Sequence, residues 1–199
     1  PANRLQAAKA VIGDFVQKRP YDQIGLAVFA SNAFSQSPPT TDHQVLARLL
    51  DRIELSTDLG IDDGTAIGMG LANAGNMLRD SDAKSKVVIL LTDGVNNAGE
   101  IDPLTAAEAA KALGIKVYTI GMGRPGQVPV PSTDLFGRET VAYQESNLDE
   151  GTLQEIADIT GGLYFRAEDT AGLKEIYDEI DSLEKSQVEV ERYTRYREL

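Results

Sequence analysis

The stretch KVVILLTDG, residues 86–94, decides the fold of this chain. Its five consecutive Val, Ile and Leu residues are too few to span a membrane and are rich in β-branching, which predicts a strand buried on both faces of a sheet. Asp93 then stands at the carboxyl end of a core strand, where ligands of open α/β sheets bind, and is a candidate site residue on this ground alone. An Asp before Gly also occurs in ordinary turns and helix caps, and that alternative stays open.

The overall composition narrows the classes of function. At 199 residues the chain suits one domain with its own core. A formal net charge of -12 argues against binding nucleic acid or an anionic membrane through the bulk surface. The chain has no cysteine, which excludes disulfides and thiolate zinc sites, and its single histidine, His43, leaves little basis for a Ser-His-Asp triad. It contains no apolar run of membrane-spanning length and no initiator Met, so we treat it as a fragment or a processed form.

Apolar residues at helical spacing alternate with short β-branched runs along the chain. The pattern predicts helices over residues 4–18, 41–53, 65–78, 102–113, 149–160 and from 170 onward, with strands over 24–30, 86–92, 116–121 and 163–166. Thr41 and Gln44 have capping-box spacing, and Asp102 and Asp149 are predicted N-caps. This alternation indicates a three-layer, doubly wound α/β fold whose mostly parallel sheet is covered by helices on both faces.

Three segments depart from this regular pattern. Phe34 is predicted to lie on a short edge strand before a turn at residues 37–39. The Pro- and Gly-rich residues 124–141 are predicted to form a surface excursion, for which a hairpin is one option. The tail concentrates Arg and Tyr as the flank of a membrane segment does, although a solvated strand or a frayed end is the alternative. We therefore divide the chain into a domain over residues 1–186 and a juxtamembrane-like tail over residues 187–199.

Several of these segments together resemble the von Willebrand factor A (VWA) domain of the bacterial aerotolerance (Bat) proteins, of the BatA-like kind. The similarity covers nearly the whole chain in order, and the segments are specific as a set. They are IGLAVFA (24–30), DGTAIG (63–68), LLTDGVNNAGEIDP (90–103), KVYTIGMG (116–123) and ITGGLYF (159–165). The resemblance implies a Rossmann-like fold and a non-enzymatic protein-interaction module.

In that family a metal ion-dependent adhesion site (MIDAS) holds one divalent cation. Its ligands come from an Asp-x-Ser-x-Ser motif after the first strand, a Thr in a second loop and an Asp in a third; Thr65 and Asp93 match the last two. Hydroxyl and carboxylate oxygens suit Mg²⁺ or Mn²⁺, and an open coordination position can accept a carboxylate from a partner protein. The further binding residues expected around this site are Asp63, Gly64, Gly94 and Asn96.

The sequence departs from the family pattern at its beginning. It starts at the helix that follows Asp-x-Ser-x-Ser in the family, and the motif occurs nowhere in the 199 residues. We therefore expect the first, central strand to be missing, the site to be incomplete, and divalent metal to bind weakly or not at all. The strands at 24–30 and 86–92 should then pair directly, or another segment or a second chain should fill the gap between them, the latter making a dimer.

A dinucleotide-binding enzyme is one competing interpretation. The G-x-G-x-x-G fingerprint occurs after a predicted strand, with its glycines at positions 121, 123 and 126. The helix that must follow the fingerprint is prevented by prolines at positions 125, 129 and 131, so we set this interpretation aside.

A metal-dependent hydrolase is the other enzymatic alternative. It would pair Asp93 with Asp62, Asp63 or Asp102. Such chemistry needs an acid and a base with separated pKa values, whereas these aspartates lie in polar loops with no evident desolvating pocket. Solvated loop and capping carboxylates explain them more simply.

We therefore predict an interaction domain, not an enzyme, whose face around Thr65 and Asp93 docks a partner protein. The resemblance implies a parent protein anchored in the bacterial inner membrane by segments outside this chain, with the domain in the periplasm. It also implies an envelope-stress system, in which other Bat-type VWA proteins and a MoxR-type AAA+ ATPase are the expected partners. No nucleic-acid partner is expected.

Overall fold

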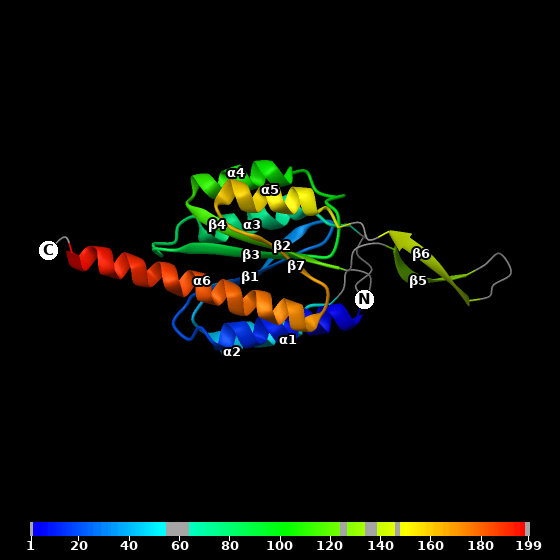
Figure 1. Ribbon diagram of the computed structural model, residues 1–199, viewed down its shortest axis with the longest axis horizontal. Helices are drawn as coiled ribbons and strands as arrows, with labels where there is room; N and C mark the ends of the chain where they lie inside the picture. Colours follow the sequence, from blue (N-terminus) through cyan, green and yellow to red (C-terminus); the bar gives the residue numbers. More distant parts are fainter. Residues whose placement is uncertain (1, 55–63, 124–126, 134–138, 146–147, 198–199) are drawn as a thin grey trace.

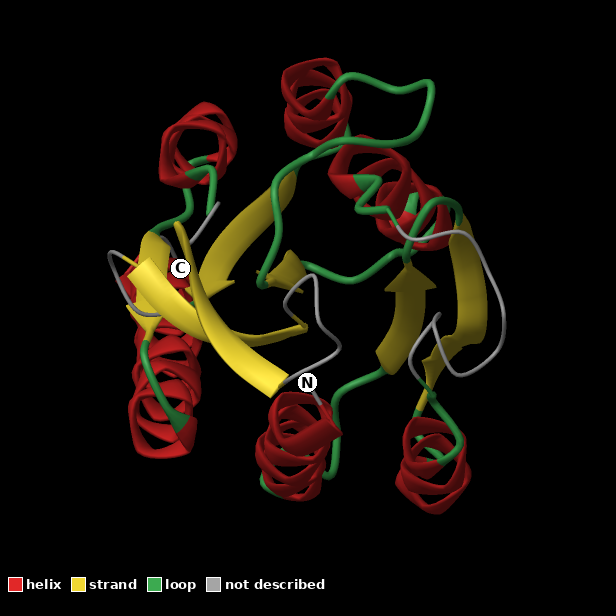
Figure 2. Cartoon of the chain, turned by 90° about the vertical axis from the view of Figure 1, so that its right-hand side faces the viewer, coloured by secondary structure: helices red, strands yellow, loops and turns green. Residues whose placement is uncertain are grey.

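The computed structural model describes residues 2–54, 64–123, 127–133, 139–145 and 148–197. Its main strands lie between two layers of helices (Figures 1 and 2). One layer consists of α3 (Ile67–Leu78), α4 (Pro103–Ala112) and α5 (Glu150–Thr160), and the other of α1 (Ala2–Gln17), α2 (His43–Asp51) and α6 (Thr170–Arg197). The three-layer α/β fold expected from the sequence is confirmed.

The described strands form three separate sheets. β3 (Lys86–Thr92), β4 (Ile115–Met122) and β7 (Tyr164–Ala167) make a parallel sheet in the order β3-β4-β7. β1 (Ile24–Phe29) pairs antiparallel with β2 (Ala33–Thr40), and β5 (Gln127–Thr133) pairs antiparallel with β6 (Glu139–Glu145). β1 and β3 are not hydrogen-bonded neighbours. Of the alternatives expected for these two strands, direct pairing is wrong, and the other, a further segment or a second chain in the gap, stays a prediction. α3 packs against both strands.

The backbone of β3 leaves a row of polar groups that β4 does not use. The N–H groups of Thr119 and Gly123 donate on the β7 side of β4, at 3.1 and 2.9 Å. Because alternate residues of a strand direct their backbone groups to opposite sides, the even-numbered residues of β4 bond to β3. Tyr118 lies opposite Ile89 in the parallel register. The residues of β3 whose N–H and C=O groups point away from β4 are therefore Val87, Ile89 and Leu91.

The core consists of two apolar clusters, one on each face of the β3-β4-β7 sheet. The first is formed with α3, α4 and α5, and it includes Val88, Leu90 and Val117. The second is formed with α1 and α6, and it includes Tyr118 and Ile120. Val87, Ile89 and Leu91 pack against the second cluster. The side chains of β3 thus pack on both faces, as its apolar run predicted.

The helix caps mostly follow the sequence predictions. Asp102 caps α4 and accepts a hydrogen bond from the N–H group of Thr105; Asp149 caps α5 and accepts one from the N–H group of Thr152. The cap of α2 differs, because Asp42 rather than Thr41 accepts from the Val45 N–H group, at 3.0 Å. A carboxylate is a stronger acceptor than a hydroxyl, and the helix begins at His43 instead of the predicted position.

Two proline-containing segments form strands. The turn predicted at residues 37–39 is wrong, because β2 continues through Pro38 and Pro39. These prolines coincide with an irregularity in the β1-β2 register between Ile24 and Leu26, and an edge strand tolerates the missing N–H groups there. The hairpin considered for residues 124–141 is observed as β5 and β6. Because β5 begins at Gln127, no helix follows the glycine fingerprint.

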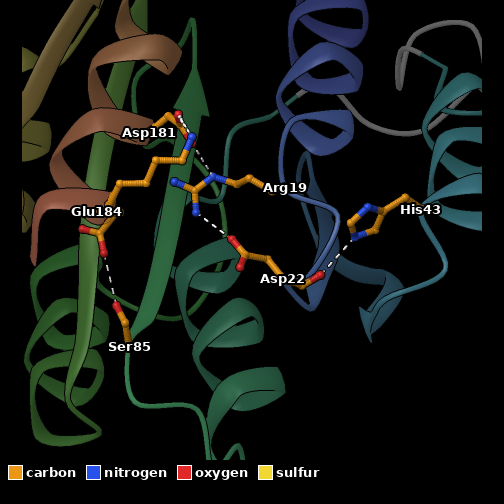
Figure 3. Close-up of polar contacts among 7 residues, drawn as sticks. Arg19, Asp22, His43, Ser85, Asp181 and Glu184 are labelled. Carbon is orange, nitrogen blue, oxygen red and sulfur yellow. Dashed lines mark hydrogen bonds and ion pairs between the residues drawn. The ribbon is translucent and has the colours of Figure 1, made fainter. Parts of the chain in front are cut away.

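The last helix runs beyond the body of the molecule (Figure 1). α6 continues from Thr170 to Arg197, so the boundary proposed between residues 186 and 187 lies inside one helix, and the strand alternative for the tail is wrong. Arg19, just after α1, forms ion pairs with Asp181 of α6 at 3.0 Å and with Asp22 at 2.7 Å (Figure 3). No helix in the described part of the chain combines the length and apolarity needed to cross a membrane.

Candidate functional site

The loop after β3 and the start of α3 meet at the carboxyl end of the strands. The Ala66 N–H group donates to the carbonyl of Ala30, just after β1, at 2.7 Å. The Asn97 N–H group donates to the carbonyl of Thr65 at 3.1 Å. The ends of β1 and β3 are therefore both connected to the residues that begin α3, and Thr65 lies between them.

Two asparagine side chains fix the loop that follows Asp93. The Asn97 side-chain oxygen accepts from the Thr65 N–H group at 2.8 Å, and the Asn96 oxygen accepts from the Ile67 N–H group at 2.8 Å. Ala66, at the N-cap position of α3, has no side chain that could cap it, so Asn96 supplies the cap from another loop. Asn96 was predicted to bind a partner, but its oxygen is used inside the fold. Asn97 was not predicted, and only its position beside Asn96 pointed to it.

The predicted glycines allow the loops to approach closely. A Cβ atom on Gly94 would lie 2.7 Å from the Thr65 hydroxyl oxygen, and one on Gly64 would lie 3.0 Å from the Ala98 Cβ atom. The structure therefore brings Gly94 next to Thr65, whose chain neighbour is Gly64, and the binding role of these residues stays a prediction. Asp63 and Asp62 lie outside the described residues.

Asp93 presents its carboxylate to solvent beside the start of α1. Its side chain is 62% exposed, and its Oδ2 atom lies 3.6 Å from Nη1 of Arg4, whose side chain is 52% exposed. An exposed ion pair of this kind contributes little to stability. The Gly94 N–H group donates to the Thr92 hydroxyl at 3.2 Å. Asp93 is thus an exposed, accessible carboxylate, and no local sequence pattern predicts that Arg4 lies beside it.

The described residues do not by themselves form a metal centre. No group of three or more His, Cys, Asp or Glu side chains is suitably arranged in the described part of the chain. Thr65 and Asp93 supply only two ligating side chains, too few to displace the hydration shell of Mg²⁺. The residues present therefore do not fit a bound divalent cation without further ligands.

Asp102, which the hydrolase alternative would pair with Asp93, serves as a helix cap. Its Oδ1 atom accepts from the N–H group of Thr105 at 2.9 Å and from the hydroxyl of the same residue at 3.1 Å. These hydrogen bonds lower the pKa of Asp102, because they stabilise its charged form. A carboxyl that acts as a general acid or base near neutral pH would need a raised pKa, so the lowered pKa of Asp102 gives the hydrolase alternative no support.

Comparisons with known proteins agree with this fold. The sequence-family model for the von Willebrand factor type A domain matches residues 2–179 of this chain. BatB from Bacteroides thetaiotaomicron is 33% identical with a TM-score of 0.73, covering 92% of this chain and 89% of that one. An aerotolerance-related membrane protein from Bacteroides fragilis is 29% identical with a TM-score of 0.70, covering 88% and 87%. An uncharacterized protein of Borreliella burgdorferi is 35% identical over 84% of this chain and 48% of its own length.

The chain spans about half the length of the curated relatives that it matches. A structure of a matrix protein from the mussel byssus, 23% identical with a TM-score of 0.70 over 92% of this chain and 41% of that one, is described as having zinc in its MIDAS motif. At that identity the likeness supports the fold alone. On the family match, the chain belongs to the von Willebrand factor type A domain family, and its similarity to the Bat proteins agrees with the motifs in its sequence.

Proposed function

We propose that this chain is a protein-interaction module whose docking face lies around Thr65 and Asp93, at the carboxyl end of the strands. The observation that carries the proposal is the accessible carboxylate of Asp93, next to a loop that Asn96 and Asn97 fix to α3. A charged group on a rigid support can recognise a partner with little ordering cost. VWA domains generally serve as non-enzymatic interaction modules, which agrees with this use of the site.

We further propose that a strand ahead of α1 completes the face. Arg4 lies beside Asp93, so α1 begins at the carboxyl end of β3. A strand that precedes α1 and runs parallel to β3 would therefore end next to Asp93. Its backbone would meet the N–H and C=O groups of Val87, Ile89 and Leu91 that point away from β4, and a right-handed crossover through α1 would lead to β1. An Asp-x-Ser-x-Ser sequence at its end would add the oxygens that the described site lacks.

The cellular setting is proposed from the Bat relatives. One similar structure is that of an aerotolerance-related membrane protein, which supports membrane association of the parent protein. We propose anchoring in the bacterial inner membrane by segments outside this chain, with the domain over residues 1–186 in the periplasm and residues 187–199 as a juxtamembrane tail. Other Bat-type VWA proteins and a MoxR-type AAA+ ATPase are the proposed partners. A second copy that fills the β1-β3 gap is the alternative to the preceding strand.

Divalent metal should stabilise only a chain with the completed face. The test compares thermal unfolding of this chain, in Mg²⁺ and in Mn²⁺, with that of a variant carrying a strand that ends in Asp-x-Ser-x-Ser ahead of Pro1. At a metal concentration about one hundred times the Kd, the extended variant should melt about 5 °C or more higher than without metal. Asp93→Ala should abolish this gain in the extended variant. Asp80→Ala is the control, because Asp80 is an exposed aspartate after α3, and this change should preserve the gain.

Two results would count against parts of this proposal. Stoichiometric micromolar Mg²⁺ binding by the unextended chain would show that its site is already sufficient. If the extended variant folds with no response to either metal, the module binds its partner without metal and Asp93 is a turn residue.

A further inference from the structure

One side of the domain is built from segments without a charged residue. Residues 23–41, which include β1 and β2, contain no Asp, Glu, Lys or Arg. The same holds for residues 64–78, which include α3. Charged residues make up 25% of the chain, so two runs of this length are a clear departure from its composition. Among the helices that the structure describes, α3 alone has no charged residue.

Burial does not account for this lack of charge. Ser35 of β2 and Asn76 of α3 are exposed, and the Phe34 side chain, also on β2, is 52% exposed. Exposed positions on the neighbouring helices carry charges, as Glu108 on α4 and Glu155 on α5 do. The uncharged residues of β2 and α3 therefore reach solvent and form part of the surface.

β2 and α3 lie side by side and share this surface. The Ser35 hydroxyl donates a hydrogen bond to Asn73 Oδ1 at 2.7 Å. Met69, Asn73 and Asn76 follow one another at i, i+4 and i+7, so they lie along one stripe of α3. We call the surface formed by Ser35, Met69, Asn73 and Asn76 the α3-β2 face. It is uncharged and joins two elements.

The backbone of β2 is poorly suited to binding a further strand. β2 pairs with β1 alone among the described strands, so its other edge is open. Pro38 and Pro39 have no N–H group, and prolines on an edge strand resist the addition of a strand. A partner on this side of the domain must therefore contact the side chains of the α3-β2 face.

The chemistry of the α3-β2 face fits a second copy of this chain. Copies with a net charge of -12 repel each other, and the repulsion is smallest where the facing surfaces carry no charge. In a two-fold dimer each residue near the axis faces its own copy, so a charged residue there would meet a like charge. The amides of Asn73 and Asn76 and the Ser35 hydroxyl both donate and accept hydrogen bonds, so each can pair with its own copy.

The size of the face predicts weak association. α3 has 12 residues and β2 has 8 residues. Their lengths are about 18 Å and about 26 Å, and a helix beside a strand is about 15 Å wide. The face thus covers roughly 300 to 400 Å² per copy, about half of the ~800 Å² that each partner contributes to a stable interface. We expect a reversible dimer with a Kd on the order of 100 μM.

We propose that two copies of this chain associate through their α3-β2 faces as a two-fold symmetric dimer held by side-chain contacts. Depletion of charge and the presence of Met are typical of the core of such an interface. Thr65 and Asp93 are not part of the face, so each copy keeps its docking face accessible. The inference does not depend on the function proposed above and goes beyond it.

Sedimentation equilibrium of the full chain, at concentrations up to about 1 mM, tests the proposal with two isosteric variants. Asn76→Asp places a like charge on each copy near the two-fold axis and should weaken the dimer about tenfold or more. Gln154→Glu adds the same charge to an exposed position of α5, away from the face, and should change the Kd by less than about twofold. Thermal unfolding checks that both variants keep the fold of the wild type.

Two further measurements locate the interface. Salt at about 1 M should restore much of the association of Asn76→Asp, because it screens the added repulsion. In NMR spectra of the wild type, the Met69 methyl and the Asn76 side-chain amide should shift with protein concentration. Asp93→Ala should leave the Kd unchanged, so failure of this proposal is distinguishable from failure of the proposed function.

Three results would overturn the proposal. The first is a chain that stays monomeric up to about 1 mM. The second is a dimer that Asn76→Asp and Gln154→Glu weaken equally. The third is a dimer that is lost in the variant extended ahead of Pro1, which would place the contact in the gap between β1 and β3.

Discussion

Replacing Glu184 with alanine should lower the free energy of unfolding by about 3 to 5 kcal/mol, because the change breaks a buried charged network. The Glu184 side chain lies against the sheet with 6% of the residue exposed. It accepts hydrogen bonds from the Tyr118 hydroxyl at 2.7 Å, from Lys116 Nζ at 3.0 Å and from the Ser85 hydroxyl at 3.1 Å, the last drawn in Figure 3. Tyr118 and Lys116 belong to β4, and Ser85 directly precedes β3. Glu184 therefore connects α6 by hydrogen bonds to β4 and to the start of β3.

The contribution of Glu184 should also depend on pH. Burial by itself raises the pKa of this carboxyl, but the hydrogen bonds from Tyr118, Lys116 and Ser85 and the charge of Lys116 together hold the pKa below its ordinary value. A group with a lowered pKa in the folded state stabilises the fold above its unfolded pKa, and the effect is lost as the pH falls through the folded pKa. Between pH 7 and acid pH, the wild-type chain should therefore lose more stability than Glu184→Gln.

Urea unfolding at several pH values measures both effects. Glu179→Ala is a matched control, because Glu179 is exposed on the same helix and its loss should change the free energy of unfolding by less than about 0.5 kcal/mol. If Glu184→Ala were no more destabilising than Glu179→Ala, Glu184 would not hold α6 against the sheet. Parallel pH profiles for the wild type and Glu184→Gln would contradict the pKa argument.

Gly68→Ala should be the most disruptive small substitution near the candidate site, with a loss of about 3 kcal/mol or more. A Cβ atom at this position of α3 would lie 2.0 Å from the carbonyl oxygen of Ile101 and 2.8 Å from its carbonyl carbon. Both atoms belong to the backbone just before the α4 cap at Asp102, so no side chain can turn aside to make room. Either α3 or the start of α4 must move, and Thr65 would move with α3.

Gly75→Ala, on the same helix, is the matched control for Gly68→Ala. Its Cβ atom would lie 3.9 Å from Ile115 Cδ1, an ordinary contact, and alanine favours a helix interior over glycine by roughly 1 kcal/mol. Stability should therefore stay the same or rise. Equal melting temperatures for Gly68→Ala and the wild type would show that α3 and α4 are not held at this close approach.

The parts of the fold that depend on local chemistry could be predicted from the sequence. The short, β-branched apolar run at residues 87–91 predicted a buried strand, and β3 is that strand. Asp102 and Asp149 were predicted as helix caps because a short carboxylate accepts hydrogen bonds from the first N–H groups of a helix. The position of Asp93 directly after the core strand predicted that it lies at the carboxyl end of the sheet, whereas Thr65 was assigned to the same site only through the resemblance to the VWA domain.

The remaining features depend on contacts between distant segments. The pair formed by Arg4 and Asp93 and the cap that Asn96 provides for α3 arise only when separate loops meet. Pro38 and Pro39 look like a turn in the sequence, yet an edge strand with an irregular register accommodates them. That β1 and β3 do not pair directly likewise depends on contacts between distant segments, because α3 packs against both strands.

The most direct test of the central claim, that the gap between β1 and β3 accepts a strand ahead of α1, is amide hydrogen exchange along β3. It compares this chain with the variant extended ahead of Pro1. Exchange should slow in the extended variant at the residues facing the gap, Val87, Ile89 and Leu91, while Val88 and Leu90, bonded to β4, should stay protected in both chains. Equal protection of the gap-facing residues in the two chains would show that the gap does not accept this strand.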